Sequence, residues 1–484
     1  MRTEFFVLLA VHVIIGSLLA LISRRYFTRD LRDYYTSSSR LGALLSAGTY
    51  AATTYSAFMM VGLVGMTYAT GIGALGFELL YLASTVVLLS TVGFKIWELS
   101  KRHNWISPSQ MLGDFYNSRV LALAVALVYL FAMIPYLAAQ IQGLRVLFSY
   151  GGLGVLECTI VSAILVYTWI FIAGMWSVAI TDTYQGFLML IGGFSYLIWT
   201  LSYLTSASGV VYSDLFEALS ERGYLGLTEF WSFTTYLAYT LPWAFFAVTN
   251  PQVVVRLYTP RDEKAYKKAV TAFYIYGFVY TLIVVLIGLT AAGLAIRGVL
   301  PGNLPWDSVT PYILGLMHPL LGSLIAISIV AAAISTANSI VLAVSGSLIS
   351  LSRSRSVALA RIIDAVLVVV ATLTAMSGMG FIVDLSVLTS VILLPLAPLT
   401  ILGVYVAGKS SNILKTSALI SLTIGVSLAT YYALILGPRK AFREVILELP
   451  ISAWVLLIST IVLLIGYIIS LSTRVIKSYL NPKQ

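Results

Sequence analysis

The chain alternates between long apolar stretches and short polar connections over its whole length. Each apolar stretch reaches about 20 residues, the length that a helix needs to cross the hydrocarbon core of a bilayer. The pattern therefore predicts an all-α integral membrane protein with about 13 transmembrane helices. These lie at 3–23, 43–70, 73–94, 120–146, 154–174, 177–204, 231–255, 268–296, 313–350, 361–378, 382–407, 413–436 and 450–472.

Two of the predicted spans carry residues that interrupt a helix at mid-membrane. In the second span, Ala51 to Ala57 is a run of small and polar residues, and the seventh span contains Pro242 and Pro251. A proline deletes one helical hydrogen bond, and a broken helix is tolerated in a bilayer where it lines a cavity or is buried in protein. Breaks five spans apart favour two inverted repeats around a midplane site. The alternative is that proline and glycine are simply common in membrane helices.

Composition excludes several other classes of protein. Hydrophobic residues make up 59% of the chain and charged residues 10%, and the mean hydropathy of +0.95 lies outside the range of soluble globular proteins. The single Cys158 rules out a disulfide framework and a cysteine metal cluster, and three scattered histidines do not suggest a zinc site. The acidic residues are dispersed, whereas membrane-embedded enzymes cluster them, so we expect no catalytic residues, no enzyme activity and no cofactor.

The net charge of +10 follows the membrane topology and does not indicate a nucleic-acid partner. If the amino terminus lies outside and each span reverses the chain, 22 of the 29 basic residues fall in inward segments. This asymmetry matches the positive-inside rule and predicts a multi-pass protein of the cell membrane with its carboxyl terminus inside. Arg24 and Arg25 follow the first span directly, which is typical of a retained helix and not of a cleaved signal peptide.

A pair of hydroxyl residues lies about half-way along the ninth span. Ser335 and Thr336 follow three alanines in a continuous apolar stretch. A hydroxyl at that depth either bonds back to its own helix or faces a polar group inside the protein. Because alanine lets another helix approach closely, two adjacent hydroxyls are also suited to a small bare cation.

Several motifs, in the correct order over about 30–470, resemble those of the sodium:solute symporter family, which includes proline, pantothenate and sodium/glucose carriers. They are Asp33 to Gly42, Ser56 to Gly62 with Gly65, Tyr68 and Gly71, Trp105 to Phe115, Thr181 to Gln185, Pro251 with Arg256, and Ala332 to Thr336. The resemblance implies a leucine-transporter-like core of two inverted five-helix repeats. We expect a first helix and basic loop at 1–40, repeats at 41–204 and 231–408, and two peripheral helices with a short tail at 409–484. The outward segment 205–230 is expected to be a solvated helix or lid.

The resemblance also implies a sodium site and an exit path. It places the ligands at the carbonyls of Ala52, Tyr55 and Ala332 and the hydroxyls of Ser335 and Thr336. It gives Asp182, early in the sixth span, a role on the inward path of the ion. The alternative for Asp182 is an interfacial aspartate that the helix dipole favours.

The substrate pocket is predicted less sharply. Its candidates are Thr54, Ser56, Glu78, Gln140, Gln142, Trp243 and Asn250. The spacing of Glu78 from Ala52 resembles that of a substrate-contacting glutamate in a sugar-carrying member, and its alternative is a pair with Arg145 or a bound proton. Trp243 is similar to a pocket residue of proline carriers, but Ala247 and Thr54 stand where those carriers have tyrosine and aspartate. For each candidate an ordinary interhelical hydrogen bond competes with a role in binding.

These observations predict a secondary active transporter that functions as a monomer in the lipid bilayer. It imports a small organic solute, such as a monocarboxylate or pantothenate-like acid, an amino acid or a sugar, with inward sodium flow. A proton-coupled carrier of the same fold, in which Glu78 and Asp182 relay protons, is the closest alternative. A solute-sensing receptor is disfavoured because only Arg474 to Gln484 follow the last span.

Overall fold

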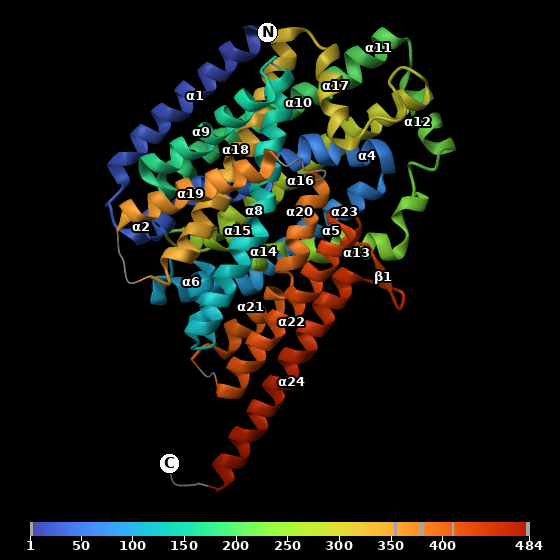
Figure 1. Ribbon diagram of the computed structural model, residues 1–484. Coiled ribbons are helices and arrows are strands. Elements are labelled where there is room, and N and C mark those ends of the chain that lie inside the picture. The colour runs from blue at the N-terminus through green and yellow to red at the C-terminus, as the bar shows by residue number, and fades with distance from the viewer. Residues whose placement is uncertain (1–2, 151, 353–355, 377–381, 409–410, 481–484) are drawn as a thin grey trace.

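A computed structural model describes residues 3–150, 152–352, 356–376, 382–408 and 411–480. This part of the chain is almost entirely helical (Figure 1), and its strands are β1 (Val445–Ile446) and β2 (Leu449–Pro450), which form a small antiparallel hairpin. The first half contains α1 (Thr3–Ser23), α2 (Leu31–Thr36), α3 (Ala43–Thr54), α4 (Val64–Thr70), α5 (Gly73–Leu88), α6 (Phe94–His103), α7 (Pro108–Phe115), α8 (Arg119–Tyr150), α9 (Val155–Ala173), α10 (Met175–Ile198), α11 (Thr205–Ser208) and α12 (Tyr212–Glu221).

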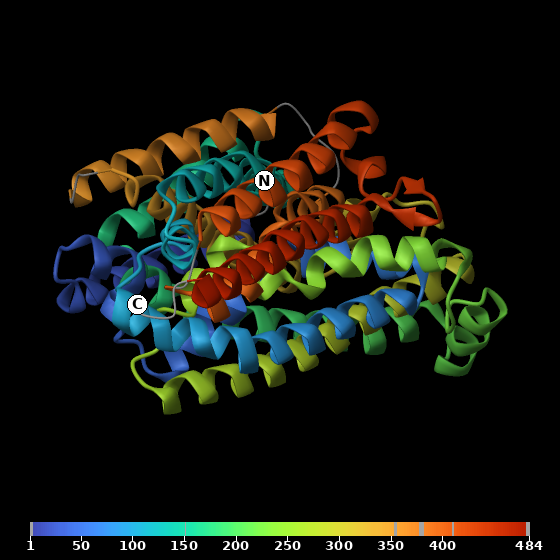
Figure 2. The ribbon, with the colours of Figure 1, turned by 90° about the horizontal axis from the view of Figure 1, so that it is seen from below.

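The second half contains α13 (Phe233–Ala244), α14 (Phe246–Thr249), α15 (Pro251–Arg256), α16 (Glu263–Ile296), α17 (Trp306–Leu316), α18 (Pro319–Ile349), α19 (Val357–Met376), α20 (Ile382–Leu393), α21 (Leu396–Val406), α22 (Asn412–Leu436), α23 (Pro438–Ala441) and α24 (Ile451–Leu480). Short π-helical or 3-10 turns lie at η1 (Arg24–Tyr26), η2 (Ser37–Ser39), η3 (Phe58–Leu63), η4 (Leu89–Gly93), η5 (Trp199–Leu204) and η6 (Glu229–Trp231). Seen from below, the long helices run roughly side by side (Figure 2), and α22 packs against α24.

The described residues contain 10 helices that are long and apolar enough to cross a membrane, and the pair α20–α21, bent by 42°, would make an eleventh. The count of 13 is therefore not confirmed, although the all-α membrane class is. The two remaining predicted spans are the ones with interrupting residues. They fall short because α3 and α13 each stop after 12 residues.

Helix α18 forms the centre of the molecule. It runs unbroken for 31 residues and packs against α10, α8, α1 and α3. Almost every side chain from Ile325 to Ser347 is buried, as expected of a helix that is apolar on all sides. The ninth predicted span is thus a continuous rod that the broken segments can pack against.

A polar cluster around Asp33 fixes the connection between α1 and α3. The buried Asp33 carboxylate accepts hydrogen bonds from the Thr28 amide (2.6 Å), the Arg40 guanidinium (2.7 Å) and the Trp176 indole (3.1 Å). Burial alone would raise the pKa of Asp33, but these donors reverse the effect and lower the pKa below its usual 3.8. The sequence motif that begins at Asp33 therefore anchors this loop to α10.

The segment 205–230 is both a solvated helix and a cover. Glu217 and Glu221 of α12 are exposed and Asp214 is half-buried. The segment that follows bonds to the ends of α4 and α5. The Ile72 amide donates to the Tyr224 carbonyl (2.8 Å), and the Thr228 hydroxyl donates to the Thr70 carbonyl (2.9 Å). Gly71, at φ +75°, allows this close approach, since a side chain there would collide with the backbone of Tyr224.

Candidate functional site

The first broken segment opens between α3 and η3. Helix α3 ends at Thr54, and Tyr55 adopts an extended backbone conformation (φ −91°, ψ 93°). The Ser56 hydroxyl accepts a hydrogen bond from the Phe58 amide (3.1 Å), a local bond that competes with continuation of the helix. The break frees the backbone carbonyls of the last turn of α3 for other partners.

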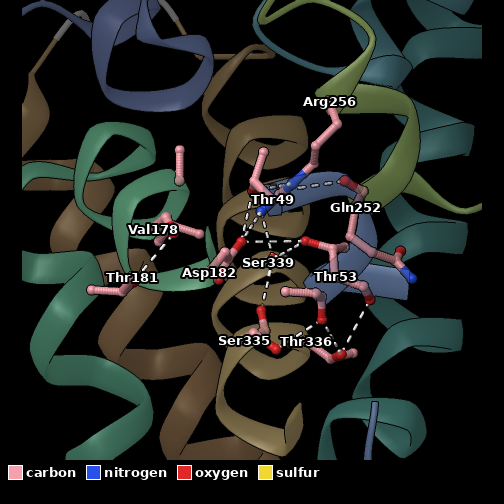
Figure 3. A network of polar contacts seen from close by, with 12 residues as sticks. Thr49, Thr53, Val178, Thr181, Asp182, Gln252, Arg256, Ser335, Thr336 and Ser339 are labelled. Carbon is pink, nitrogen blue, oxygen red and sulfur yellow. Dashed lines mark hydrogen bonds and ion pairs between the residues drawn. The ribbon is translucent and has the colours of Figure 1, made fainter. Parts of the chain in front are cut away.

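Those carbonyls meet the two hydroxyls of α18. The Ser335 hydroxyl lies 2.8 Å from the Ala52 carbonyl oxygen and 2.9 Å from that of Ala332. The Thr336 hydroxyl lies 3.1 Å from the Thr53 carbonyl oxygen and 3.4 Å from that of Ala52 (Figure 3). All five residues are buried, so this cluster of oxygen atoms is enclosed by protein.

Four of the five predicted sodium ligands therefore come together, namely Ala52, Ala332, Ser335 and Thr336. Tyr55 lies in the break itself, and no hydrogen bond of the described residues joins its carbonyl to the cluster; its ring stacks against Phe273 of α16. Thr53, which the sequence reasoning did not include, contributes a carbonyl instead. The back-bond to the same helix that we considered as an alternative is present for Ser335, in addition to its bond across to α3.

A buried ion pair lies beside this cluster. Asp182 of α10 and Arg256 of α15 approach to 3.7 Å, and neither side chain has any exposed surface. The Thr49 hydroxyl donates to the Asp182 carboxylate (2.6 Å), and Arg256 donates to Thr49 (3.3 Å) and to the Gln252 carbonyl (3.0 Å). The opposite charges and these hydrogen bonds offset much of the cost of burying both groups, although Oδ1 of Asp182 has no hydrogen-bond partner among the described residues.

The ion pair is connected to the oxygen cluster by hydroxyl groups (Figure 3). The Ser339 hydroxyl donates to the Ser335 carbonyl (2.8 Å), lies 2.7 Å from the Thr53 hydroxyl, and accepts a hydrogen bond from Arg256. Ser335 and Ser339 are one helical turn apart on α18, so they line the same face. A continuous polar path thus leads from the cluster to Asp182.

Two expectations about these charges are corrected by the structure. Asp182 follows the start of α10 by two turns and is fully buried, so it is not an interfacial aspartate at a helix start. Arg256 directly follows the seventh predicted span (231–255) and so falls in an inward loop of the predicted topology, but it is buried inside the protein. Without Arg256, most basic residues of the sequence still fall in the predicted inward segments. Among these, Arg353, Arg355 and Lys409 lie outside the described residues.

The candidate substrate residues fall into two groups. Trp243, at the end of α13, stands in an aromatic cluster with ring centroids of Phe58 at 5.0 Å, Phe246 at 5.1 Å, Tyr81 at 5.4 Å and Phe77 at 6.1 Å. This cluster joins the break after α3 to α5 and to the second broken segment. It therefore brings Trp243 near the break that follows α3.

The second group is polar and centred on Glu78. Glu78 lies between Phe77 and Tyr81 on α5 and is buried. Within the described residues it forms no ion pair, so the pair with Arg145 that we considered as an alternative is not found. Gln140 follows Tyr136 by one turn of α8 and therefore lies on the same face of that helix.

Several of these buried polar groups have no hydrogen-bond partner among the described residues. They are Oγ1 of Thr54, Oε2 of Glu78, both amide atoms of Gln140, Nε1 of Trp243 and Nδ2 of Asn250. Ser56 already bonds to the backbone, and Gln142 is half-buried and has a partner of its own. Unpaired buried polar groups are rare in proteins and commonly mark places where water or a ligand binds.

The second broken segment is separated into α13, α14 and α15 by Phe245 and Asn250. Pro251 begins α15, where its missing N–H costs nothing. The Asn250 side-chain oxygen accepts from the Thr249 hydroxyl (2.9 Å), and the segment ends with Arg256. The predicted break is confirmed at Pro251, whereas Pro242 lies inside α13 and does not interrupt it. The break orients Arg256 towards Asp182.

Sequence reasoning missed most of the network around Asp182. Thr49 and Thr53 are spaced by one turn on α3, as Ser335 and Ser339 are on α18, and such pairs of hydroxyls are a readable signal. The ion pair of Arg256 could have been expected in part. An arginine buried among membrane helices needs a carboxylate partner, and the predicted spans contain few carboxylates. No local pattern, however, indicates that its partner is Asp182.

Comparison with known proteins shows which family the chain resembles. The family whose model matches is the sodium:solute symporter family, over residues 34–408. The chain is 26% identical to the sodium/pantothenate symporter of Haemophilus influenzae over 291 residues, or 58% of this chain and 57% of that protein. It is 25% identical to a sodium/proline symporter of Staphylococcus aureus over 364 residues, or 71% and 67%. The matches to the pantothenate symporters of Haemophilus influenzae and Escherichia coli span less than two thirds of those relatives' own length.

Solved structures share the fold. A Na⁺-coupled sialic acid symporter in a substrate-bound outward-open state superposes with a TM-score of 0.80 at 16% identity, covering 96% of both chains. A transporter of the nucleobase-cation-symport-1 family superposes with a TM-score of 0.58 at 12% identity, covering 91% of this chain and 95% of that one. These likenesses confirm the leucine-transporter-like helical core.

Proposed function

The chain belongs to the sodium:solute symporter family, and from that premise we propose that it imports a small organic solute by coupling it to inward sodium flow. The observation that carries this proposal is the buried cluster of carbonyl and hydroxyl oxygens between the broken α3 and the continuous α18. Hard oxygen donors suit an alkali cation, and a midplane site at a broken helix is the arrangement that alternating-access transporters use.

Sodium would be held by the carbonyls of Ala52 and Ala332 and the hydroxyls of Ser335 and Thr336, with Tyr55 completing the shell. Because a hydroxyl rotates freely, Ser335 and Thr336 can turn their oxygen atoms from the neighbouring carbonyls to an ion. No carboxylate is among these groups, so binding relies on dipoles and is weak enough for release. We assign Asp182 to the exit path, since Ser339 and Arg256 link it to the cluster.

Coupling would arise because the ion and the solute stabilise the same arrangement of α3. Sodium joins the last turn of α3 to α18, and the solute contacts the residues just after the break, so each favours binding of the other. A membrane potential that is negative inside adds about 2.3 kcal/mol of driving force for each positive charge that enters, for every 100 mV. One ion per turnover is then sufficient to concentrate a neutral solute.

The solute would bind among Thr54, Ser56, Glu78, Gln140, Trp243 and Asn250. The aromatic cluster around Trp243 offers an apolar face, and the unpaired polar groups offer donors and acceptors. An ionised Glu78 repels a carboxylate, so the hydroxyl or amine end of a pantothenate-like acid, amino acid or sugar suits that side of the pocket.

Proton coupling is the second candidate, and it rests on the burial of two acidic residues, Glu78 and Asp182, inside the membrane domain. Buried ionisable groups in spans mark proton relays in many carriers. Sodium is favoured because Asp182 is already neutralised by Arg256 and because the oxygen cluster lacks any titratable group.

The remaining assignments belong to the same proposal. We place the protein in the cell membrane as a monomer, with its amino terminus outside and its carboxyl terminus inside. We divide it into a first helix at 1–40, repeats at 41–204 and 231–408, and peripheral helices at 409–484.

Uptake into proteoliposomes tests the proposal. The purified chain is supplied with labelled solutes, including pantothenate, proline, a monocarboxylate and a sugar, under an inward sodium gradient. Replacing sodium by choline at constant pH should abolish uptake of the accepted solute. Uptake that persists in choline and follows an imposed proton gradient would establish the proton-coupled candidate instead.

A further inference from the structure

A cavity of about 320 Å³ opens where α1, α9 and α19 meet at one end. Helix α9 packs against both α1 and α19 (Figure 1). The residues that line the cavity are Arg24, Phe27, Arg29, Ile172, Val357 and Arg361. Three arginines thus line one small cavity together with three apolar residues, and no acidic residue is among the described residues that line it.

The three arginines are available to bind an anion. Among the described residues none of them forms an ion pair, although Arg361 interacts at longer range with the buried Asp364. The Arg361 guanidinium lies over the Phe171 ring, 4.5 Å from its centroid, and its buried Nε has no hydrogen-bond partner. Arg29 adopts a left-handed backbone conformation (φ +65°), unusual for a residue other than glycine.

The cavity lies at the boundary of the membrane. The apolar span of α1 ends at Tyr26, and that of α19 begins at Val357. Beside the cavity, helix faces expose large apolar residues, with Leu21 50%, Phe171 46% and Ile362 60% exposed. In a membrane helix such faces contact lipid acyl chains. The cationic cavity therefore lies at the end of a lipid-facing surface.

We propose that this cavity binds the phosphate group of an anionic phospholipid. Guanidinium groups bind phosphate oxygens in pairs of parallel hydrogen bonds, and arginine is preferred over lysine for this geometry. Basic pockets between membrane helices on the inner side recognise anionic headgroups. The apolar residues of the cavity wall and the adjoining acyl-chain surface favour a lipid over free phosphate. This proposal is independent of the transported solute.

Lipid binding to the purified full chain, measured by native mass spectrometry, tests the proposal. Phosphatidylglycerol, phosphatidylcholine and inorganic phosphate are the three probes. Phosphatidylglycerol should bind most tightly, and Arg29→Gln and Arg361→Gln should each weaken its binding about five-fold, the effect of one basic charge near an anionic surface. Thermal unfolding verifies that each variant is folded. If Arg361→Gln does not fold, the result for Arg29→Gln alone decides the test.

Arg25→Gln is the matched control. Arg25 neighbours the cavity residues, is exposed, and bonds to the Ile22 carbonyl without lining the cavity. It should leave lipid binding unchanged. An equal loss in Arg25→Gln, equal binding of phosphatidylcholine, or inorganic phosphate that binds as tightly as the lipid would each overturn the proposal. An equal loss in Arg25→Gln would show that the lipid is attracted to the basic surface in general. Equal binding of phosphatidylcholine would show that the charge of the headgroup does not matter, and tight binding of inorganic phosphate would show a site for the free ion.

Discussion

The ion pair between Asp182 and Arg256 should respond to substitution as a unit. Both side chains are fully buried, and their charged atoms are 3.7 Å apart. At an effective dielectric constant of about 20, unit charges at this separation attract by about 4 kcal/mol. Removing either charge leaves the other buried without compensation, so Asp182→Asn and Arg256→Gln should each lower the free energy of unfolding by about 3–5 kcal/mol.

The double variant should lose much less than the sum of the two single losses. It leaves no uncompensated charge, and the neutral side chains can still bond to Thr49 and to the Gln252 carbonyl. The coupling energy from the double-mutant cycle should therefore exceed about 2 kcal/mol. Equilibrium unfolding of the purified variants in mixed micelles measures all four free energies.

An exposed pair in the loop between α15 and α16 provides the control. Arg261 and Asp262 approach to 3.0 Å, closer than the buried pair, but their side chains are 66% and 51% exposed. Their cycle should give less than about 1 kcal/mol because solvent screens the charges. Additive losses at Asp182 and Arg256, or equal coupling in the exposed pair, would refute the reasoning that burial makes this interaction strong.

Three further perturbations test separate parts of the structure. Because folding lowers the pKa of Asp33, its contribution to stability is complete above about pH 4 and is lost as the pH falls through the lowered value. Thermal unfolding measured against pH should show this loss of stability. In Asp33→Asn this pH dependence should disappear. Gly65→Ala places a methyl group against the Trp306 carbonyl and should cost about 1–3 kcal/mol, whereas Gly315→Ala, with open space around it, should cost nothing. Glu78→Gln should weaken solute binding in isothermal titration and leave the sodium requirement unchanged; loss of the sodium requirement would contradict the assigned roles.

The sequence predicted the breaks in the fold well because their causes are local. Pro251 cannot continue a helix, and Ser56 with its small neighbours competes for backbone hydrogen bonds. Each break can therefore be recognised from the sequence of the segment in which it lies. Ser335 and Thr336 were recognised as candidates for the same reason. Apolar runs of about 20 residues likewise indicate spans. Three of the predicted spans do not form single helices, because the second and seventh are broken and the eleventh is the bent pair α20–α21.

The pairing of distant residues could not be predicted from local patterns. Asp182 and Arg256 meet only because α10 and α15 both pack against α3, and neither flanking sequence encodes that contact. Arg256 resembled a loop residue by its place at the end of a span, and only its burial reveals otherwise. The substrate pocket has the same difficulty, since Glu78, Gln140 and Trp243 lie on three helices whose relative angles decide which atoms face one another.

The central claim is that sodium is held where α3 breaks beside α18, and the sodium dependence of transport in Ser335→Ala/Thr336→Ala tests it most directly. Loss of two ligands should raise the sodium concentration for half-maximal uptake at least about tenfold. Ser328→Ala, which removes a buried hydroxyl from the same helix outside the cluster, should leave that concentration unchanged. An unaltered sodium dependence in a folded double variant would contradict the account.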